Sequence, residues 1–113
     1  MVPLIEEGLV ATCAIVDLQV LYSTRSAADY VEVLEERRAL DAAPVTSEVM
    51  ETAIELQRAL ARRGQHRIPI PDLIISASAH RSNLVVLHYD EDFARIHDVG
   101  GAAHEWVVPR GTV

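Results

Sequence analysis

Two groups of acidic residues lie where an apolar stretch meets the expected start of a helix. In the first group, Pro71 to Ala77, an aspartate follows a proline. In the second, Leu84 to Phe93, an apolar run ends in Asp90 and Asp92, two acids one residue apart. Carboxylates gathered at the end of a buried strand repel one another. A hard divalent cation with oxygen ligands would neutralise them, so these segments predict a metal-dependent site.

Each acid also has a simpler interpretation. Asp72 can serve as a helix-start acid that complements the helix dipole. Asp90 or Asp92 can cap the helix that follows, and a capping carboxylate keeps lone pairs for a metal. A phosphatase-like D-x-D is a rival interpretation of Asp90 and Asp92. That motif usually follows the first strand of a longer chain, whereas this pair comes late.

Basic residues concentrate in one place, just before the first acidic group: Arg58, Arg62, Arg63, His66 and Arg67. Arg58 and Arg62 are four residues apart and share a helix face. The run is either a solvated face or a phosphate-contacting ledge that leads to Asp72. His88, which precedes the D-x-D, is either a substrate contact or a structural histidine at a strand end.

Composition limits the function classes. The chain has 113 residues, which suggests one domain with a single core. Half of the residues are hydrophobic and only 4% are aromatic, so aliphatic side chains must build that core. The formal charge of −7 argues against binding to nucleic acid by broad charge attraction alone. It leaves open a nucleic-acid enzyme whose acidic pocket works through bound metal.

The single cysteine, Cys13, rules out an internal disulfide and a cysteine-based zinc site. Its apolar neighbours predict a buried structural thiol. No stretch approaches the length of a membrane span, and the N-terminal residues do not resemble a signal peptide. We therefore expect a cytoplasmic protein with no membrane contact.

Helical periodicity alternates with short apolar strands, which predicts an α/β fold with a mainly parallel sheet flanked by helices. Thr46 can cap the clearest helix, Glu48 lies in its first turn, and Arg62 and Arg63 are expected in its last turn. In such folds ligand sites lie beyond the carboxyl ends of the strands. The expected helices are residues 14–24, 27–40, 46–63, 71–82 and 90–98, and the expected strands are residues 9–12, 84–88 and 104–108.

The first residues do not match the start that is expected for a complete α/β sheet. Residues 3–7 resemble the tail of a helix closed by Gly8. A doubly wound fold usually begins with a strand that becomes central, and no such strand is expected here. We therefore expect strands 9–12 and 84–88 to face each other across a gap. Exposed edges and apolar faces of this kind favour pairing with another chain, which predicts a homo-oligomer or a partner-bound species.

Three segments in order resemble a PIN-domain ribonuclease of the VapC toxin type. They are Cys13 to Gln19, Ile70 to Ala77 and Val86 to Phe93, and the trailing Glu105 to Val108 is similar to the last strand of that family. The P-D-L-I-I-x-A and H-Y-D-x-D-F pieces are specific as a pair and weak individually. The resemblance covers nearly the whole chain.

The resemblance implies a PIN-like three-layer fold, with residues 1–113 as a single domain. It implies hydrolysis of RNA phosphodiester bonds with Mg²⁺ or Mn²⁺, and a cognate antitoxin that blocks the active site. Carried over by position, the catalytic and metal-binding acids are Asp72, Asp90 and Asp92. Contacts to RNA would come from Arg58, Arg62, Arg63, Arg67 and His88.

Two departures from the family pattern affect the expected activity. The aspartate of the family's first strand has no counterpart, and the family's second acid, a glutamate, falls at Gln19. Asp17 lies about 200° around the helix from that position and cannot simply replace it. Either the sequence starts too late or the chain is a degenerate member. We expect little RNA cleavage, and the alternative function is a non-catalytic PIN-like protein that binds an antitoxin or another chain.

Overall fold

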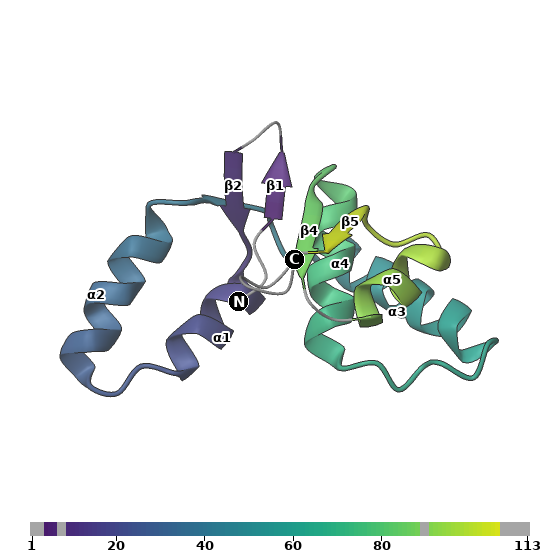
Figure 1. Ribbon diagram of the computed structural model, residues 1–113, viewed down its shortest axis with the longest axis horizontal. Helices are drawn as coiled ribbons and strands as arrows, with labels where there is room; N and C mark the ends of the chain where they lie inside the picture. The colour runs from purple at the N-terminus through teal and green to yellow at the C-terminus, as the bar shows by residue number, and fades with distance from the viewer. Residues whose placement is uncertain (1–3, 7–8, 89–90, 107–113) are drawn as a thin grey trace.

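The computed structural model describes residues 4–6, 9–88 and 91–106. Five strands in this part form one sheet in the order β3-β2-β1-β4-β5, with helices on either side of its central strands (Figure 1). The strands are β1 (Leu4–Glu6), β2 (Leu9–Thr12), β3 (Asp41–Ala42), β4 (Val85–His88) and β5 (His104–Trp106). The helices are α1 (Ala14–Tyr22), α2 (Ala27–Arg38), α3 (Ser47–Ala61), α4 (Ile70–Arg81) and α5 (Glu91–Asp98).

The sheet is mainly parallel, as predicted. β2 pairs with β3 in parallel, and β4 pairs with β5 in parallel. β1 lies between β2 and β4 and is antiparallel to both, so the other four strands share one direction. The α/β class is therefore confirmed, with one reversed strand at the centre.

The expected helix tail at residues 3–7 is wrong, because Leu4–Glu6 forms β1. The expected gap between β2 and β4 is wrong for the same reason, since Leu4 pairs with Ala11 on one side and Val86 on the other. Two residues separate β1 from β2 in the sequence, a spacing typical of hairpins. Gly8, which suggested a helix end, lies outside the described residues.

The direction of β1 matters for the site. Glu6 pairs with Leu9, the first residue of β2, and therefore lies at the edge opposite to the carboxyl ends of the parallel strands. Within the described part of the chain, β1 brings no acidic residue to the edge where ligand sites of α/β folds lie.

The core lies where α3 and α4 pack together. The predicted stripe of α3 is buried, and so are seven consecutive residues of α4, Leu73 to Ala79. The hydroxyl of Ser76 accepts the backbone N–H of Ala102 at 3.1 Å, which ties α4 to the segment before β5. A Cβ atom at Gly101 would lie 2.8 Å from Ser76 Oγ, so this close approach requires glycine.

The helix ends agree with the sequence to within a few residues. The Thr46 hydroxyl accepts the N–H of Val49 at 3.2 Å, which confirms the predicted cap. α3 ends at Ala61, so Arg62 is its C-cap and Arg63 follows the helix; their placement in the last turn is wrong. None of the described helices is long and apolar enough to cross a lipid bilayer.

Candidate metal site at the carboxyl edge of the sheet

Three helices begin at the edge of the sheet where the parallel strands end. α1 follows β2 almost directly, and α5 follows β4. α4 packs against β4 and connects to it by three residues, so the two run in opposite directions and α4 also begins near this edge (Figure 1). The first turns of these helices contain Asp17, Asp72 and Asp92. Topology thus brings acids that are distant in sequence to one edge.

Asp72 lies in the first turn of α4, which starts one residue before the predicted Pro71. Pro69 is the N-cap, and its extended backbone starts the helix without a side-chain hydrogen bond. The Asp72 N–H donates to the Pro69 carbonyl at 3.0 Å, and the side chain is half-buried. Asp72 therefore lies at a helix start, as the simpler interpretation predicts. This position is compatible with a second role as a metal ligand.

Asp92 lies in the first turn of α5 with its side chain 16% exposed. Its Oδ1 is 3.3 Å from a guanidinium nitrogen of Arg95, whose other terminal nitrogen contacts Glu91 at 3.1 Å. Asp92 and Arg95 also line a cavity of about 290 Å³ together with Arg67, from the loop after α3. This carboxylate therefore lies in a recess with two arginines.

Asp90 lies outside the described residues, as does the side chain of His88, although the His88 backbone ends β4 and pairs with Trp106. Among the residues that the structure describes, no three His, Cys, Asp or Glu side chains gather closely enough to hold a metal ion. Whether Asp90 completes such a group stays a prediction.

Gln19 is exposed on α1, whereas Asp17 takes part in a polar cluster. Asp17 Oδ1 accepts the Arg37 Nε–H at 2.9 Å and the Thr12 hydroxyl at 2.8 Å. Arg37 also donates to the Thr12 hydroxyl at 2.7 Å. The side chains of Arg37 and Asp17 are 10% and 27% exposed. The carboxylate of Asp17 faces Thr12 and Arg37, about 200° around α1 from position 19, so it does not take the place of an acid there.

Sequence reasoning missed this cluster of Thr12, Asp17 and Arg37, although one signal was available. Arg37 recurs at the spacing of the apolar residues of α2, and a cation in an apolar row often marks a buried ion pair. The neighbouring Cys13 is buried, as predicted. Burial raises the pKa of the Cys13 thiol above its ordinary value, so the side chain is a neutral packing group.

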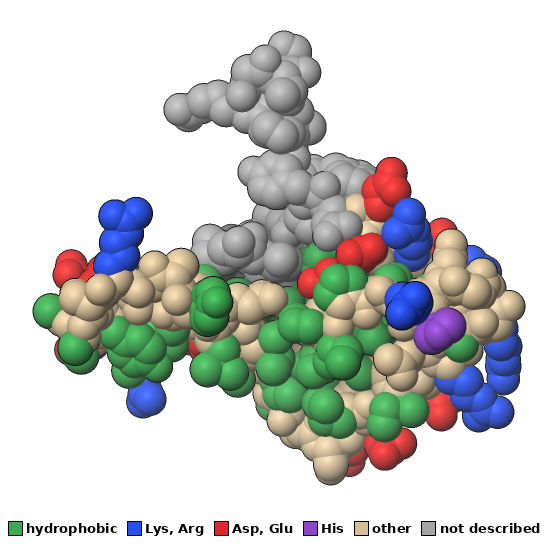
Figure 2. Space-filling view, turned by 90° about the horizontal axis from the view of Figure 1, so that it is seen from below, with side chains coloured by type: hydrophobic (Ala, Val, Ile, Leu, Met, Phe, Trp, Pro, Cys, Tyr) green, Lys and Arg blue, Asp and Glu red, His purple; other side chains and the backbone are tan. Residues whose placement is uncertain are grey.

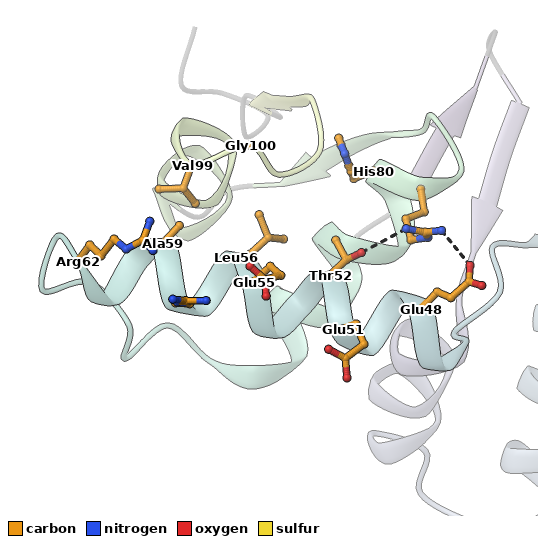
Figure 3. Close-up of a pocket in the computed structure, with 12 residues that line it drawn as sticks. Glu48, Glu51, Thr52, Glu55, Leu56, Ala59, Arg62, His80, Val99 and Gly100 are labelled. Atoms are coloured by element: carbon orange, nitrogen blue, oxygen red, sulfur yellow. Dashed lines mark hydrogen bonds and ion pairs between the residues drawn. The ribbon is translucent and has the colours of Figure 1, made fainter.

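The structure divides the predicted basic ledge. Arg58 and Arg62 line a second cavity, of about 560 Å³, between α3 and the ends of α4 and α5 (Figure 3). Arg67 instead lines the cavity that contains Asp92. Arg63 is exposed on the loop after α3. Arg67 thus shares a recess with a predicted acid, Asp92.

Comparison with known proteins identifies the family of this chain. The PIN domain family matches residues 1–99 of the chain. A relative over nearly the whole length, Ribonuclease VapC51 of Mycobacterium tuberculosis, is 41% identical over 111 residues, which cover 98% of this chain and 81% of the relative. The chain therefore belongs to the PIN domain family.

Two further comparisons concern VapC-type proteins within this family. Ribonuclease VapC21 of M. tuberculosis is 44% identical over 112 residues, covering 97% of this chain and 81% of the relative. A crystal structure of a VapBC toxin–antitoxin family member from M. tuberculosis, VapBC-5, superposes with a TM-score of 0.58 at 28% identity. That comparison covers 82% of this chain and 75% of the other. The resemblance to VapC-type PIN domains and the PIN-like fold are thus confirmed.

Proposed function

We propose that this chain is a toxin endoribonuclease that hydrolyses RNA phosphodiester bonds with a divalent cation and is neutralised by a cognate antitoxin. The observation that carries the proposal is the similarity to a VapC ribonuclease over 98% of the chain. The PIN domain match, residues 1–99, contains all three predicted acids.

We propose Asp72, Asp90 and Asp92 as the residues that hold Mg²⁺ or Mn²⁺. Carboxylate oxygens are the ligands that hard cations prefer, and this set contains no thiol or imidazole. The bound cation supplies Lewis-acid activation of the phosphodiester and of the attacking water. Two of the acids begin helices at one edge of the sheet, which supports a shared site. Arg95, 3.3 Å from Asp92, would share that carboxylate with the cation.

The charge of the site limits its metal affinity. The negative charge of its ligands sets how strongly an oxygen site binds a cation, and the neutral amide of Gln19 adds no negative charge. Asp17 is neutralised by Arg37 at 2.9 Å. We therefore propose weak metal binding and little cleavage at ordinary Mg²⁺ concentrations. The same observations favour the alternative function, a degenerate PIN-like protein that binds an antitoxin or another chain without cutting RNA.

We propose Arg67 as a contact to RNA. It lines the cavity of Asp92 and has no ion pair with any described residue. An arginine can contact a phosphate with two N–H groups. RNA contacts by Arg58, Arg62, Arg63 and His88 stay predictions.

Exposed apolar side chains on α1 and α2 support a protein partner, for which we propose the antitoxin. Tyr22 is 92% exposed and Leu18 is 61% exposed, and Tyr30 and Val31 of α2 are exposed as well. Figure 2 shows hydrophobic side chains in separate groups on this part of the molecule. Leu18 and Tyr22 are four residues apart on one face of α1, and exposed apolar side chains that lie together favour an interaction site. Cytoplasmic location stays a prediction.

The test restores the missing charge. We expect Gln19→Glu to raise Mn²⁺ affinity roughly tenfold or more, because it adds an anionic ligand. RNA cleavage should rise with it, and Asp72→Ala or Asp92→Ala in the Gln19→Glu background should abolish both. Calorimetric titration with Mn²⁺ and a cleavage assay with and without EDTA measure the two effects.

Matched controls separate a local effect from a general change in charge. Gln57→Glu makes the same chemical change on α3, and Asp98→Asn removes an exposed acid from the end of α5. Neither should alter Mn²⁺ affinity. Cleavage by Gln19→Glu that survives Asp72→Ala would contradict the assignment of the acids. Failure of every variant to cleave, with antitoxin binding intact, would favour the non-catalytic alternative.

A further inference from the structure

Two histidine side chains meet where β5 begins, at the edge of the sheet opposite to the predicted acids. His97 comes from the last turn of α5, and His104 is the first residue of β5. The centres of their rings are 5.2 Å apart, and the ring planes are inclined by 60°. His97 is exposed and His104 is half-buried, so solvent reaches the pair. Neither histidine belongs to the predicted acids or RNA contacts.

The register of the sheet explains why the two rings meet. His104 pairs in parallel with Val86, whose side chain is fully buried in the core. Residues paired in register point to the same face of a sheet, so His104 lies on the face that the core covers. α5 packs against β5, as Figure 1 shows. His97 directly follows the buried Ile96 and therefore lies at the rim of the helix face that contacts the core.

A hydrogen-bonded turn fixes the backbones of both histidines. The N–H of Gly100 donates to the His97 carbonyl at 2.9 Å, and the φ angle of +104° at this position favours glycine. On the other side of the turn, the Val86 N–H donates at 2.9 Å to the carbonyl of Ala103, the residue before His104. A helix end and a strand start thus hold the pair. A ligand that uses both rings therefore needs little ordering of the backbone.

We propose that His97 and His104 together bind a late transition-metal ion such as Zn²⁺, through one imidazole nitrogen of each ring. Imidazole suits Zn²⁺, Ni²⁺ and Cu²⁺, whereas Mg²⁺ and Mn²⁺ prefer oxygen ligands. With Zn–N bonds of ~2.0–2.1 Å in tetrahedral geometry, the centres of two imidazole ligands lie about 5 Å apart. The separation of 5.2 Å between the two rings agrees with this requirement. The rings are tilted rather than stacked in parallel, which allows their in-plane lone pairs to converge on one ion.

The proposed site has two protein ligands, and water completes the coordination of the ion. Among the residues that the structure describes, no third His, Cys, Asp or Glu joins this pair closely enough to hold a metal. The affinity is therefore well below that of a structural zinc site with four protein ligands. An imidazole has two nitrogens, so His104 can bind the ion through one and keep a further contact through the other.

The neighbouring charges favour a cation over an RNA phosphate. Asp98 follows His97 and Glu105 follows His104, and both acids are exposed. Negative charge close to the pair attracts cations and repels a phosphate backbone. A bound ion would fasten the end of α5 to the sheet, and the first turn of the same helix contains Asp92. The proposal does not depend on whether the acids hold a metal or the chain cleaves RNA.

The test is a double-mutant cycle of Zn²⁺ binding on the full chain. Titration calorimetry compares the unaltered chain with His97→Gln, with His104→Gln and with the double variant. We expect each single substitution to weaken Zn²⁺ binding at least about tenfold, because one imidazole alone is a poor ligand set. The double substitution should weaken it little further, because either single change already breaks the shared site. Electron paramagnetic resonance of bound Cu²⁺ should show two coordinated nitrogens in the unaltered chain and one in each single variant.

The matched control is His66→Gln, which removes an exposed imidazole from the loop after α3 and should leave Zn²⁺ affinity unchanged. Excess Zn²⁺ should raise the urea midpoint of the unaltered chain and of this control, but not that of His97→Gln or His104→Gln. Urea unfolding without Zn²⁺ shows whether the variants fold. Losses of affinity that add in the double variant would mean two independent surface histidines and would overturn the proposal. So would an equal loss in His66→Gln, or no binding up to about 1 mM Zn²⁺.

Discussion

α2 and α3 share a helical spacing of apolar residues, yet the structure treats them differently. α3 buries Val49, Ala53, Leu56 and Leu60, whereas α2 buries none of its residues. α3 packs along α4, while α2 contacts mainly α1 and stands apart from the body of the molecule (Figure 1). Apolar periodicity therefore predicts that a helix forms, and it does not tell which surface covers the apolar side of that helix.

The two helices are also held by different forces. Burial of apolar side chains stabilises α3, and this hydrophobic effect depends little on how the buried groups are oriented. α2 is tied to β2 and α1 through a directed contact, in which Arg37 binds Asp17 and Thr12. A partner that covers the apolar side of α2 would add the burial that the isolated chain lacks. The contrast thus agrees with an antitoxin contact at α1 and α2.

The largest expected difference between the two helices comes from removing apolar volume. Leu60→Ala should lower the free energy of unfolding by ~2–5 kcal/mol, because Leu60 is fully buried and a cavity would remain. Val31→Ala on the exposed side of α2 should change it by less than about 0.5 kcal/mol. Urea unfolding followed by circular dichroism measures both. Equal losses would mean that α2 is packed in solution and that the contrast is wrong.

A smaller effect is expected when the directed contact is broken. Arg37→Met keeps the aliphatic stem but leaves the Asp17 carboxylate and Thr12 hydroxyl without their cation. We expect a loss of ~1–3 kcal/mol, reduced by the partial exposure of Asp17. Hydrogen exchange of the α2 amides should accelerate more than exchange in α3. The control is Arg38→Met, at an exposed position of the same helix, and an equal effect there would exclude a specific role for Arg37.

Much of the fold could be predicted because its signals are local. The α3 helix has a cap at Thr46 and a clean apolar stripe, and both are present in the structure. The reversed strand Leu4–Glu6 could not be predicted in this way. Three residues are too few to show a period of two, and the position of β1 depends on edges offered by β2 and β4, far apart in sequence.

The candidate site was only partly predictable. The motifs place Asp72 and Asp92 at helix starts, and the chain order brings both helices to one edge. The sequence does not show that Asp92 faces Arg95, or that Arg67 shares its recess while Arg58 lies at another. Those facts depend on how α3, α4 and α5 pack, and packing of nonlocal elements is not encoded in a short motif.

The smallest expected effect compares the two helix caps directly. The Ser26 hydroxyl accepts the N–H of Asp29 at 3.0 Å to start α2, as Thr46 does at 3.2 Å to start α3. Thr46→Ala should lower the global free energy of unfolding by ~1 kcal/mol, because α3 is part of the core. Ser26→Ala removes a similar hydrogen bond, but fraying of α2 exposes no buried apolar surface. Its cost should appear as faster amide exchange within α2, with the urea midpoint nearly unchanged. If both substitutions shift the midpoint equally, α2 unfolds together with the core, and the exposed helix is as firmly integrated as the buried one.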